Sequence, residues 1–215
     1  MSIATRVQQL LPQTSTEGVT VADYVTSAIA VFSRYRPKLV TEEVTVTTPG
    51  YEFSLPTSWV NEFSRVDSVE YPAGQNPPAM LRSDNYFLYR TSTGLKLRFS
   101  YQVQDKYIIT YTTLWTESGL STYDAESVAI LASALICDEL AAKYAGSIDD
   151  VVQTVSGLWK TKSREYMDAR KNFLNTFYIR TGIDLQGGRS SPAVIYQQES
   201  MPTLKGYRVN DWSDD

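Results

Sequence analysis

The sequence predicts an α+β fold: a small helical bundle around a central alanine-rich helix, with an inserted antiparallel β-sheet and an extended C-terminal arm. Three observations lead to this prediction. Hydrophobic residues recur at helical spacing near the N-terminus and again in the second half of the chain, strict alternation fills the region between them, and neither period continues to the C-terminus. The expected segments are N-terminal helices at 1–37, a β insertion at 38–116, central and long helices at 117–183 and an arm at 184–215.

The N-terminal segment predicts two helices, each ended by a proline. Hydrophobic side chains from Ile3 to Leu11 lie at helical spacing, and Pro12 ends this short helix. A second helix is predicted from Thr20, where Thr20 and Asp23 fit a capping box. Pro37 ends this helix because proline cannot continue the helical hydrogen-bond pattern. We expect the second helix to pack against the alanine-rich helix.

Alternation with a period of two predicts the β insertion. Val44 and Val46 alternate with threonines, and Pro49-Gly50 forms a turn before the next alternating segment. The clearest hairpin has its turn at residues 91–94, and the segment after this turn alternates strictly. The expected strands lie near residues 39–46, 51–55, 64–71, 86–90, 95–101 and 107–111. An antiparallel sheet with one solvent-exposed face accounts for this pattern.

Residues Asp124–Tyr144 predict the helix around which the other helices pack. The segment contains neither Gly nor Pro, and Ser121 with Asp124 can form a capping box at its start. Two of its faces are apolar, which is typical of a helix that neighbours bury, and its many alanines let a second helix approach closely. The uncharged run Ser127–Cys137 is too short to cross a membrane, which needs ~20 apolar residues.

A long helix and an arm complete the prediction. The long helix presents Tyr166 and Phe173 on its apolar face, and Thr181-Gly182 is a C-terminal glycine stop. Residues 186–215 show no regular period but contain spaced apolar side chains, which purely solvating tails avoid. We interpret this arm as a segment that lies either on its own domain or on another subunit. Its candidate contact residues are Ile195, Tyr196, Met201, Leu204, Tyr207 and Trp212.

The composition argues against nucleophilic catalysis. The chain has no His and a single Cys, Cys137, which removes Ser-His-Asp and Cys-His chemistry, histidine metal sites and an intramolecular disulfide. Asp138 and Glu139 could form the carboxylate pair of a glycoside hydrolase, but we interpret them as side chains that reach solvent. Asp149-Asp150 supplies too few oxygen ligands to indicate a metal site. We therefore predict no enzyme, catalytic residue, metal or cofactor, and neither a signal peptide nor a membrane segment.

Charge and aromatic content leave two kinds of binding function open. A net charge of −4 without a dense basic block gives no footprint for sequence-independent nucleic-acid binding. Fifteen Tyr and four Trp suit either a core or an interface. Trp59 and Trp115, near strand ends, could stack on a sugar in a carbohydrate- or receptor-binding module of a virion or secreted protein. Packing at the edge of the sheet is the competing interpretation.

Motifs between residues 20 and 177 follow one another in a recognisable order. They are Arg34-Tyr35-Arg36-Pro37, Ser64–Pro72, Pro77-Pro78, Tyr89–Phe99, the alanine-rich helix from Asp124, and a long helix with Lys162-Ser163 and Tyr166. In this order they resemble the neck adaptor proteins of tailed bacteriophages, also called head–tail connector or head-completion proteins. The arm after Gly182 is longer than in short members of that family.

The resemblance implies a structural virion protein without catalytic residues. Such adaptors have a small helical bundle with a β insertion and form a ring, typically a dodecamer, beneath the portal protein. The expected partners are the portal protein, adjacent copies of the chain and the next neck (stopper) or tail protein. Genomic DNA would pass through the channel without sequence-specific binding. The expected location is the neck of the virion, after synthesis in the host cytoplasm.

Overall fold

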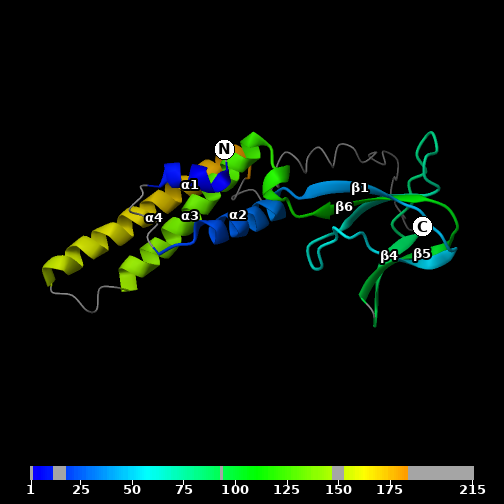
Figure 1. The fold of residues 1–215 in the computed structure, drawn as a ribbon, viewed down its shortest axis with the longest axis horizontal. Helices are drawn as coiled ribbons and strands as arrows, with labels where there is room; N and C mark the ends of the chain where they lie inside the picture. The colour runs from blue at the N-terminus through cyan, green and yellow to red at the C-terminus, as the bar shows by residue number, and fades with distance from the viewer. Residues whose placement is uncertain (1, 12–17, 93, 147–152, 184–215) are drawn as a thin grey trace, which may run out of the picture.

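The computed structural model describes residues 2–11, 18–92, 94–146 and 153–183, and these residues form a mixed α/β structure. It contains four α-helices and two small antiparallel sheets within the described ranges. Figure 1 shows an elongated molecule with the helices at one end and the strands at the other. No described helix is both long and apolar enough to cross a bilayer. The predicted arm at 184–215 lies outside the described residues.

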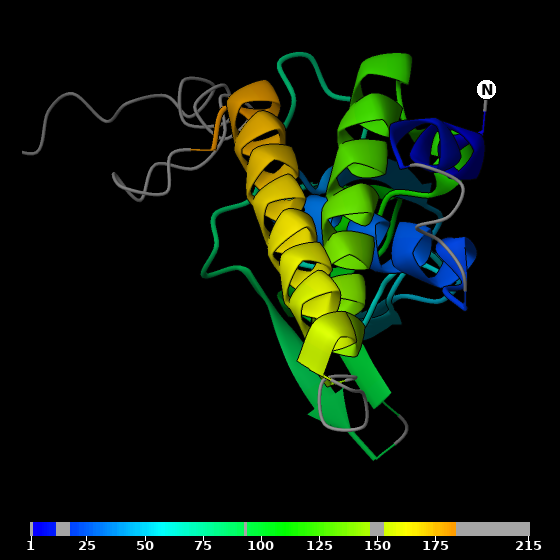
Figure 2. The ribbon, with the colours of Figure 1, turned by 90° about the vertical axis from the view of Figure 1, so that its left-hand side faces the viewer.

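The helices share one apolar core. They are α1 (Ile3–Leu10), α2 (Val21–Tyr35), α3 (Thr122–Gly146) and α4 (Gln153–Thr181). Helix α3 contacts each of the other three helices, and Figure 2 shows α4 running alongside it. The largest fully buried side chains of this core are Val7, Phe32, Ile136, Leu140 and Phe177. We call these four helices and their core the helical unit.

Helix α3 is buried on all sides over its middle turns. Every residue from 127 to 134 is buried, because alanines and two serines keep the helix narrow enough for neighbours to approach closely. Ser127 and Ser133 satisfy their hydroxyls within the helix, donating to the carbonyl oxygens of Tyr123 (3.1 Å) and Ala129 (2.9 Å). No buried polar group of these two serines is therefore left unpaired.

Of the two predicted capping boxes, the one at the start of α3 forms in part and the one at the start of α2 does not form. Ser121 caps α3 as expected, since its Oγ accepts the N–H of Asp124 at 3.1 Å. The carboxylate of Asp124 accepts from the Ser121 hydroxyl (2.7 Å) and from Arg36 (2.9 Å), so the reciprocal half of the box goes to a tertiary contact. The capping box predicted at Thr20 is wrong, because its side chain makes no cap hydrogen bond and only its carbonyl accepts the N–H of Asp23 (3.1 Å).

The end of α4 confirms the predicted glycine stop. The helix ends at Thr181, and Gly182 follows with a φ of 68°, a left-handed conformation that favours glycine. The N–H of Ile183 then donates to the carbonyl oxygen of Tyr178 at 3.1 Å, which satisfies one of the last carbonyls of the helix. Ile183, the last described residue, packs against the core of the helices.

The strands form two three-stranded sheets instead of the single sheet predicted. Sheet A has the order β1-β6-β3, and sheet B has the order β2-β5-β4. All neighbouring strands are antiparallel. The strands are β1 (Lys38–Val44), β2 (Gly50–Ser54), β3 (Val66–Glu70), β4 (Tyr86–Thr91), β5 (Gly94–Val103) and β6 (Tyr107–Thr113). The predicted β4–β5 hairpin is confirmed, with Thr91 opposite Gly94.

A second apolar core lies between the two sheets. Every connection between consecutive strands except the β4–β5 hairpin passes from one sheet to the other, and alternate residues of both sheets face the same interior. The rings of Phe53, Phe99 and Tyr107 meet there at centroid distances of 5.2–5.7 Å. Burial raises the pKa of Tyr107 to about 12. We call the two sheets and this core the β unit.

Candidate interaction surfaces

The outer strand of sheet B carries apolar side chains that no described residue buries. In β4, Phe87, Leu88 and Tyr89 are 47%, 39% and 41% exposed. Because consecutive residues of a strand point to opposite faces, this apolar run is exposed on both faces of the sheet edge. The inner side of β4 is occupied by β5, with Leu88 opposite Leu97. We call Tyr86–Thr91 and its outer edge the β4 edge.

The β4 edge is positively charged. Strands β4 and β5 carry Arg90, Lys96 and Arg98 and no carboxylate. The guanidinium of Arg98 lies over the ring of Tyr89, 5.2 Å from its centroid, and its Nη1 is 3.5 Å from the carboxylate of Glu52. This arrangement holds the Tyr89 ring in place while it remains accessible. A partner with apolar and acidic groups suits this edge.

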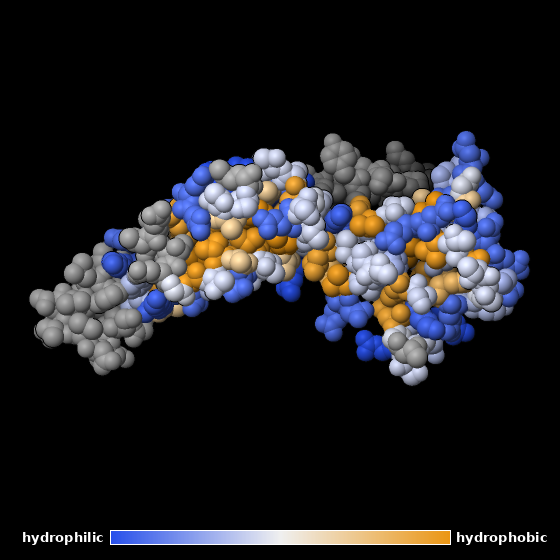
Figure 3. All heavy atoms as spheres, viewed as in Figure 1, coloured by the Kyte–Doolittle hydropathy of each residue, from blue (hydrophilic) through white to orange (hydrophobic). Residues whose placement is uncertain are grey.

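A second surface is an apolar groove on the helical unit. The groove encloses about 400 Å³ between the first turn of α1, one face of α2 and residues 114–117. Its lining consists of Ala4, Ala22, Val25, Thr26, Ile29, Ala30, Leu114, Trp115, Thr116 and Glu117. Figure 3 shows apolar side chains gathered over α2 and α3 on the face it draws. Small side chains along α2 allow close approach of another chain.

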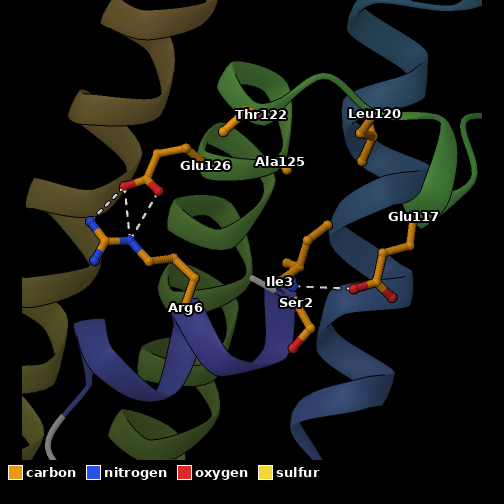
Figure 4. A pocket seen from close by; sticks show the side chains of 8 residues that line it. All are labelled: Ser2, Ile3, Arg6, Glu117, Leu120, Thr122, Ala125 and Glu126. Atoms are coloured by element: carbon orange, nitrogen blue, oxygen red, sulfur yellow. Dashed lines mark hydrogen bonds and ion pairs between the residues drawn. The ribbon is translucent and has the colours of Figure 1, made fainter.

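A pocket of about 250 Å³ lies where α1 meets the start of α3. Figure 4 shows its polar groups paired with one another. The Nε of Arg6 donates to both carboxylate oxygens of Glu126 (2.9 and 3.0 Å), and Nη2 donates to one of them (2.8 Å). The N–H of Ile3 donates to Glu117 at 3.1 Å. The hydrogen bond from Arg6 holds the pKa of Glu126 below its ordinary value. The Arg6–Glu126 ion pair and the Ile3–Glu117 hydrogen bond therefore hold α1 against the rest of the helical unit.

The junction between the helical unit and the β unit is built around Trp115. Its backbone N–H donates to Ser33 Oγ at 3.1 Å, and its indole Nε1 donates to the carbonyl oxygen of Arg36 at 2.6 Å. Lys38 Nζ lies 5.8 Å from the indole centroid. Arg36 in turn pairs with Asp124 at 2.9 Å. These contacts join the segment that leaves α2 to the segment that enters α3.

The two tryptophans singled out as a sugar-stacking pair belong to different cores. Trp59 packs in the β unit, with its ring 5.7 Å from that of Tyr111. Trp115 packs against the helical unit. Trp59 Nε1 is buried and has no hydrogen-bond partner among the described residues. Both indoles are thus used in packing and do not form one exposed platform, but Trp115 packs against the helices and not at the edge of the sheet, where the competing interpretation had placed it.

The loop before β3 is held down by a small polar network. The hydroxyl of Tyr111 donates to Glu42 at 2.5 Å and is hydrogen-bonded to Ser58. Ser58 Oγ also lies 3.1 Å from a carboxylate oxygen of Glu42, and the carbonyl oxygen of Ser58 accepts from Thr113 at 2.8 Å. Burial, followed by the hydrogen bond to Glu42, raises the pKa of Tyr111. The network fixes the position of the loop against sheet A.

The acidic residues considered for chemistry lie on the surface. Asp138 and Glu139 are exposed on α3, and Asp138 pairs with Arg170 at 3.2 Å, which confirms that this pair reaches solvent. Asp149-Asp150 lies outside the described residues. Among the residues that the structure describes, no group of three or more potential ligands could hold a metal ion.

The predicted arm contacts lie outside the described ranges. They are Ile195, Tyr196, Met201, Leu204, Tyr207 and Trp212. Sequence reasoning missed the β4 edge, although one signal was available. Four consecutive apolar residues, Tyr86 to Tyr89, cannot all face one side of a strand, so some of them must be exposed or face a partner.

Comparison with known proteins identifies no relative: no family model matches the chain, and no curated protein matches it. Its function is therefore inferred from the sequence motifs and from the surfaces of the folded chain.

Proposed function

We propose that this chain is a head-to-tail adaptor of a tailed bacteriophage, a structural virion protein that forms a ring under the portal. Such a ring extends the DNA channel and provides the attachment platform for the next neck or tail protein. The proposal includes a helical bundle around α3, with residues between α2 and α3 as the β insertion and residues 184–215 as an arm. The chain acts by shape and contact instead of by catalysis.

The observation that carries the proposal is the division of the chain into two apolar cores. Helices from both ends of the described chain share one core, and the strands between them share the other. This is the arrangement that the resemblance to neck adaptors implies. An elongated subunit with two units can present one end to a ring below and the other to a ring above.

The exposed surfaces support an assembly function. The β4 edge and the groove along α2 lie on different units and differ in shape and charge. A ring requires such unlike surfaces, because each copy meets its two neighbours through different faces. Exposed aromatic side chains such as Phe87 and Tyr89, with Arg98 lying over the Tyr89 ring, are typical of the centre of protein interfaces.

The direct test is the mass and shape of the chain with and without its partner. The full-length chain is mixed with the portal protein of the same phage, and complexes are examined by mass photometry and electron microscopy. We expect a ring bound to one face of the portal. A chain lacking residues 186–215 should lose portal binding or subunit association if the arm is a contact. Unchanged virion assembly and portal binding by that variant would contradict the role of the arm.

A carbohydrate- or receptor-binding module is a second candidate, favoured by one observation. Tyr51, Phe87 and Tyr89 expose aromatic rings on sheet B, with exposed fractions of 51%, 47% and 41%, and exposed rings can stack on sugars. A glycan array probed with the full-length chain separates the two functions. Binding of one glycan class by a monomer, lost in Tyr89→Ala, would favour the module over the adaptor.

A further inference from the structure

We propose that β1 of one copy of this chain pairs with β4 of the next copy, so that neighbouring subunits share a continuous β-sheet. The inference rests on the proposed function and deepens it by naming the two surfaces that meet. It commits to a second copy as the occupant of the β4 edge. Three features of the β unit lead to this pairing: which edges are covered, which are apolar, and how charge is divided between the sheets.

Two of the four sheet edges are protected within the chain. The outer side of β3 is covered by the segment near residue 80, where the N–H of Leu81 donates to the carbonyl oxygen of Val69 at 2.8 Å. Strand β2 is short, and its pairing is interrupted by an irregularity between Gly50 and Glu52. Short or bulged edges resist further strand addition. Strands β1 and β4 pair regularly along their inner sides and have no strand on their outer sides among the described residues.

The β4 edge has the character of a strand that adds to another sheet. From Phe87 to Tyr89, no described strand pairs with its outer backbone groups, and the side chains of these three residues are apolar and exposed. Strand addition would satisfy the backbone groups and bury the side chains together. The outer face of β1 also exposes an apolar side chain, that of Leu39, which is 42% exposed.

The two sheets carry opposite charge. Sheet B has three cations, Arg90, Lys96 and Arg98, and one carboxylate, Glu52. Sheet A has one cation, Lys38, and four carboxylates, Glu42, Glu43, Asp67 and Glu70. Lys106 beside sheet A adds one more cation through its ion pair with Glu43 (2.7 Å), and carboxylates still outnumber cations there. The acidic edge strand is β1 and the basic edge strand is β4.

This division of charge selects a contact between copies in head-to-tail order. Strands β1 and β4 belong to different sheets, and the β4–β5 hairpin projects away from β1 and β6 in Figure 1. Pairing β4 with a second β4 would bring two basic edges together, which is unfavourable. Pairing β4 with β1 brings unlike charges together and leaves one free edge of each kind, so association can continue until it closes into a ring.

Cysteine cross-linking tests the pairing on the full-length chain. Thr41→Cys and Tyr89→Cys place thiols near the middle of β1 and β4, and both positions are exposed. The native Cys137 is buried, and burial raises its pKa to about 11, so it serves as an internal unreactive control. The variants are treated with a short bis-maleimide, alone, as a mixture and as a double variant, and products are separated by denaturing gel electrophoresis.

The proposal predicts a specific pattern of products. Each single variant alone stays uncross-linked, the mixture of the two gives covalent dimers, and the double variant gives a ladder of higher multimers. Dimers from Tyr89→Cys alone would instead show β4 paired with itself and would overturn the proposal. A chain that forms rings by mass photometry without a ladder would overturn it too, while leaving the adaptor function standing. A ladder from a chain that never binds a portal would support the pairing and count against the adaptor function.

Charge reversal tests the same contact without changing an aromatic side chain. Arg90→Glu should weaken association about two- to fivefold, the range measured for exposed ion pairs, and added salt should reduce the difference. Arg164→Glu on the exposed face of α4 is the matched control, and it should leave association unchanged. Equal weakening by both variants would show a general charge effect and contradict the pairing. Circular dichroism establishes that both variants are folded.

Discussion

Replacing Ser33 by alanine tests whether the junction contributes to stability through one buried hydrogen bond. Ser33 is completely buried near the end of α2. Its hydroxyl donates to the carbonyl oxygen of Ile29 (2.7 Å) and accepts the backbone N–H of Trp115 (3.1 Å). The alanine variant removes both bonds and leaves the N–H of Trp115 without this acceptor. The carbonyl of Ile29 keeps its place in the helical hydrogen-bond pattern.

The expected loss follows from the unpaired N–H. A donor left unsatisfied in a protein interior costs about 1–3 kcal/mol. Because Trp115 is only partly buried, we expect Ser33→Ala to lower the free energy of unfolding by about 1–2 kcal/mol. For a chain of this size, that corresponds to a fall in melting temperature of about 2–8 °C. Alanine also has a higher helix propensity than serine, which offsets a few tenths of a kcal/mol.

Ser133→Ala is a matched control for this measurement. Ser133 is also completely buried in a helix, and its hydroxyl also donates to the carbonyl four residues earlier, at 2.9 Å. Its hydroxyl accepts no backbone N–H from another segment among the described residues, so its replacement should change stability by less than about 0.5 kcal/mol. Urea unfolding followed by circular dichroism and by tryptophan fluorescence measures both variants. Equal stability of the two variants would refute the assignment of a stabilising role to the Ser33–Trp115 bond.

Three further predictions concern buried or paired groups. Acidification should weaken the attachment of α1, because Arg6 lowers the pKa of Glu126 in the folded state. The stability that this ion pair contributes is present at neutral pH and is lost as pH falls through the folded-state pKa. In acid unfolding, Glu126→Gln should therefore lose less stability than the native chain below pH ~4.5. Alkali should destabilise the β unit between pH 10 and about 12, because the pKa of Tyr107 is about 12 in the folded state and 10.0 in the unfolded state. In this range the unfolded chain loses the phenol proton more readily than the folded chain does. Tyr107→Phe should reduce this pH dependence in thermal unfolding. Phe177→Ala should lower the free energy of unfolding by about 3–5 kcal/mol in urea titrations, since the ring is completely buried.

Periodicity predicted the elements of the chain better than their tertiary partners. The alternation that placed a hairpin at residues 91–94 also placed strands on either side of Pro49-Gly50, and both pairs of segments are indeed strands. The first pair forms a hairpin, whereas β1 and β2 belong to different sheets. An alternating pattern fixes which residues share a face, but the same pattern fits one sheet with a wet face and two sheets with a common core.

The candidate surfaces could be predicted only where composition limits the choices. The absence of histidine and the position of Cys137 within an apolar helix follow directly from the sequence. The β4 edge depends on strand order, which places β5 and not β4 in the middle of sheet B. In the central position, β5 buries Leu97, Phe99 and Val103 and has both of its backbone edges paired, whereas β4 leaves one edge without a strand among the described residues.

The junction determines how the two cores act together in an assembly. Every contact described around Trp115 joins residues 33–38, which lead out of the helical unit, to the segment that returns to it. Because the cores share no side chain, weakening these contacts would leave each core intact and change how firmly one unit is held against the other. A sheet edge that binds a neighbour can orient the helices of that neighbour through this junction. We therefore expect junction variants that remain folded to lose ring order before they lose subunit contact.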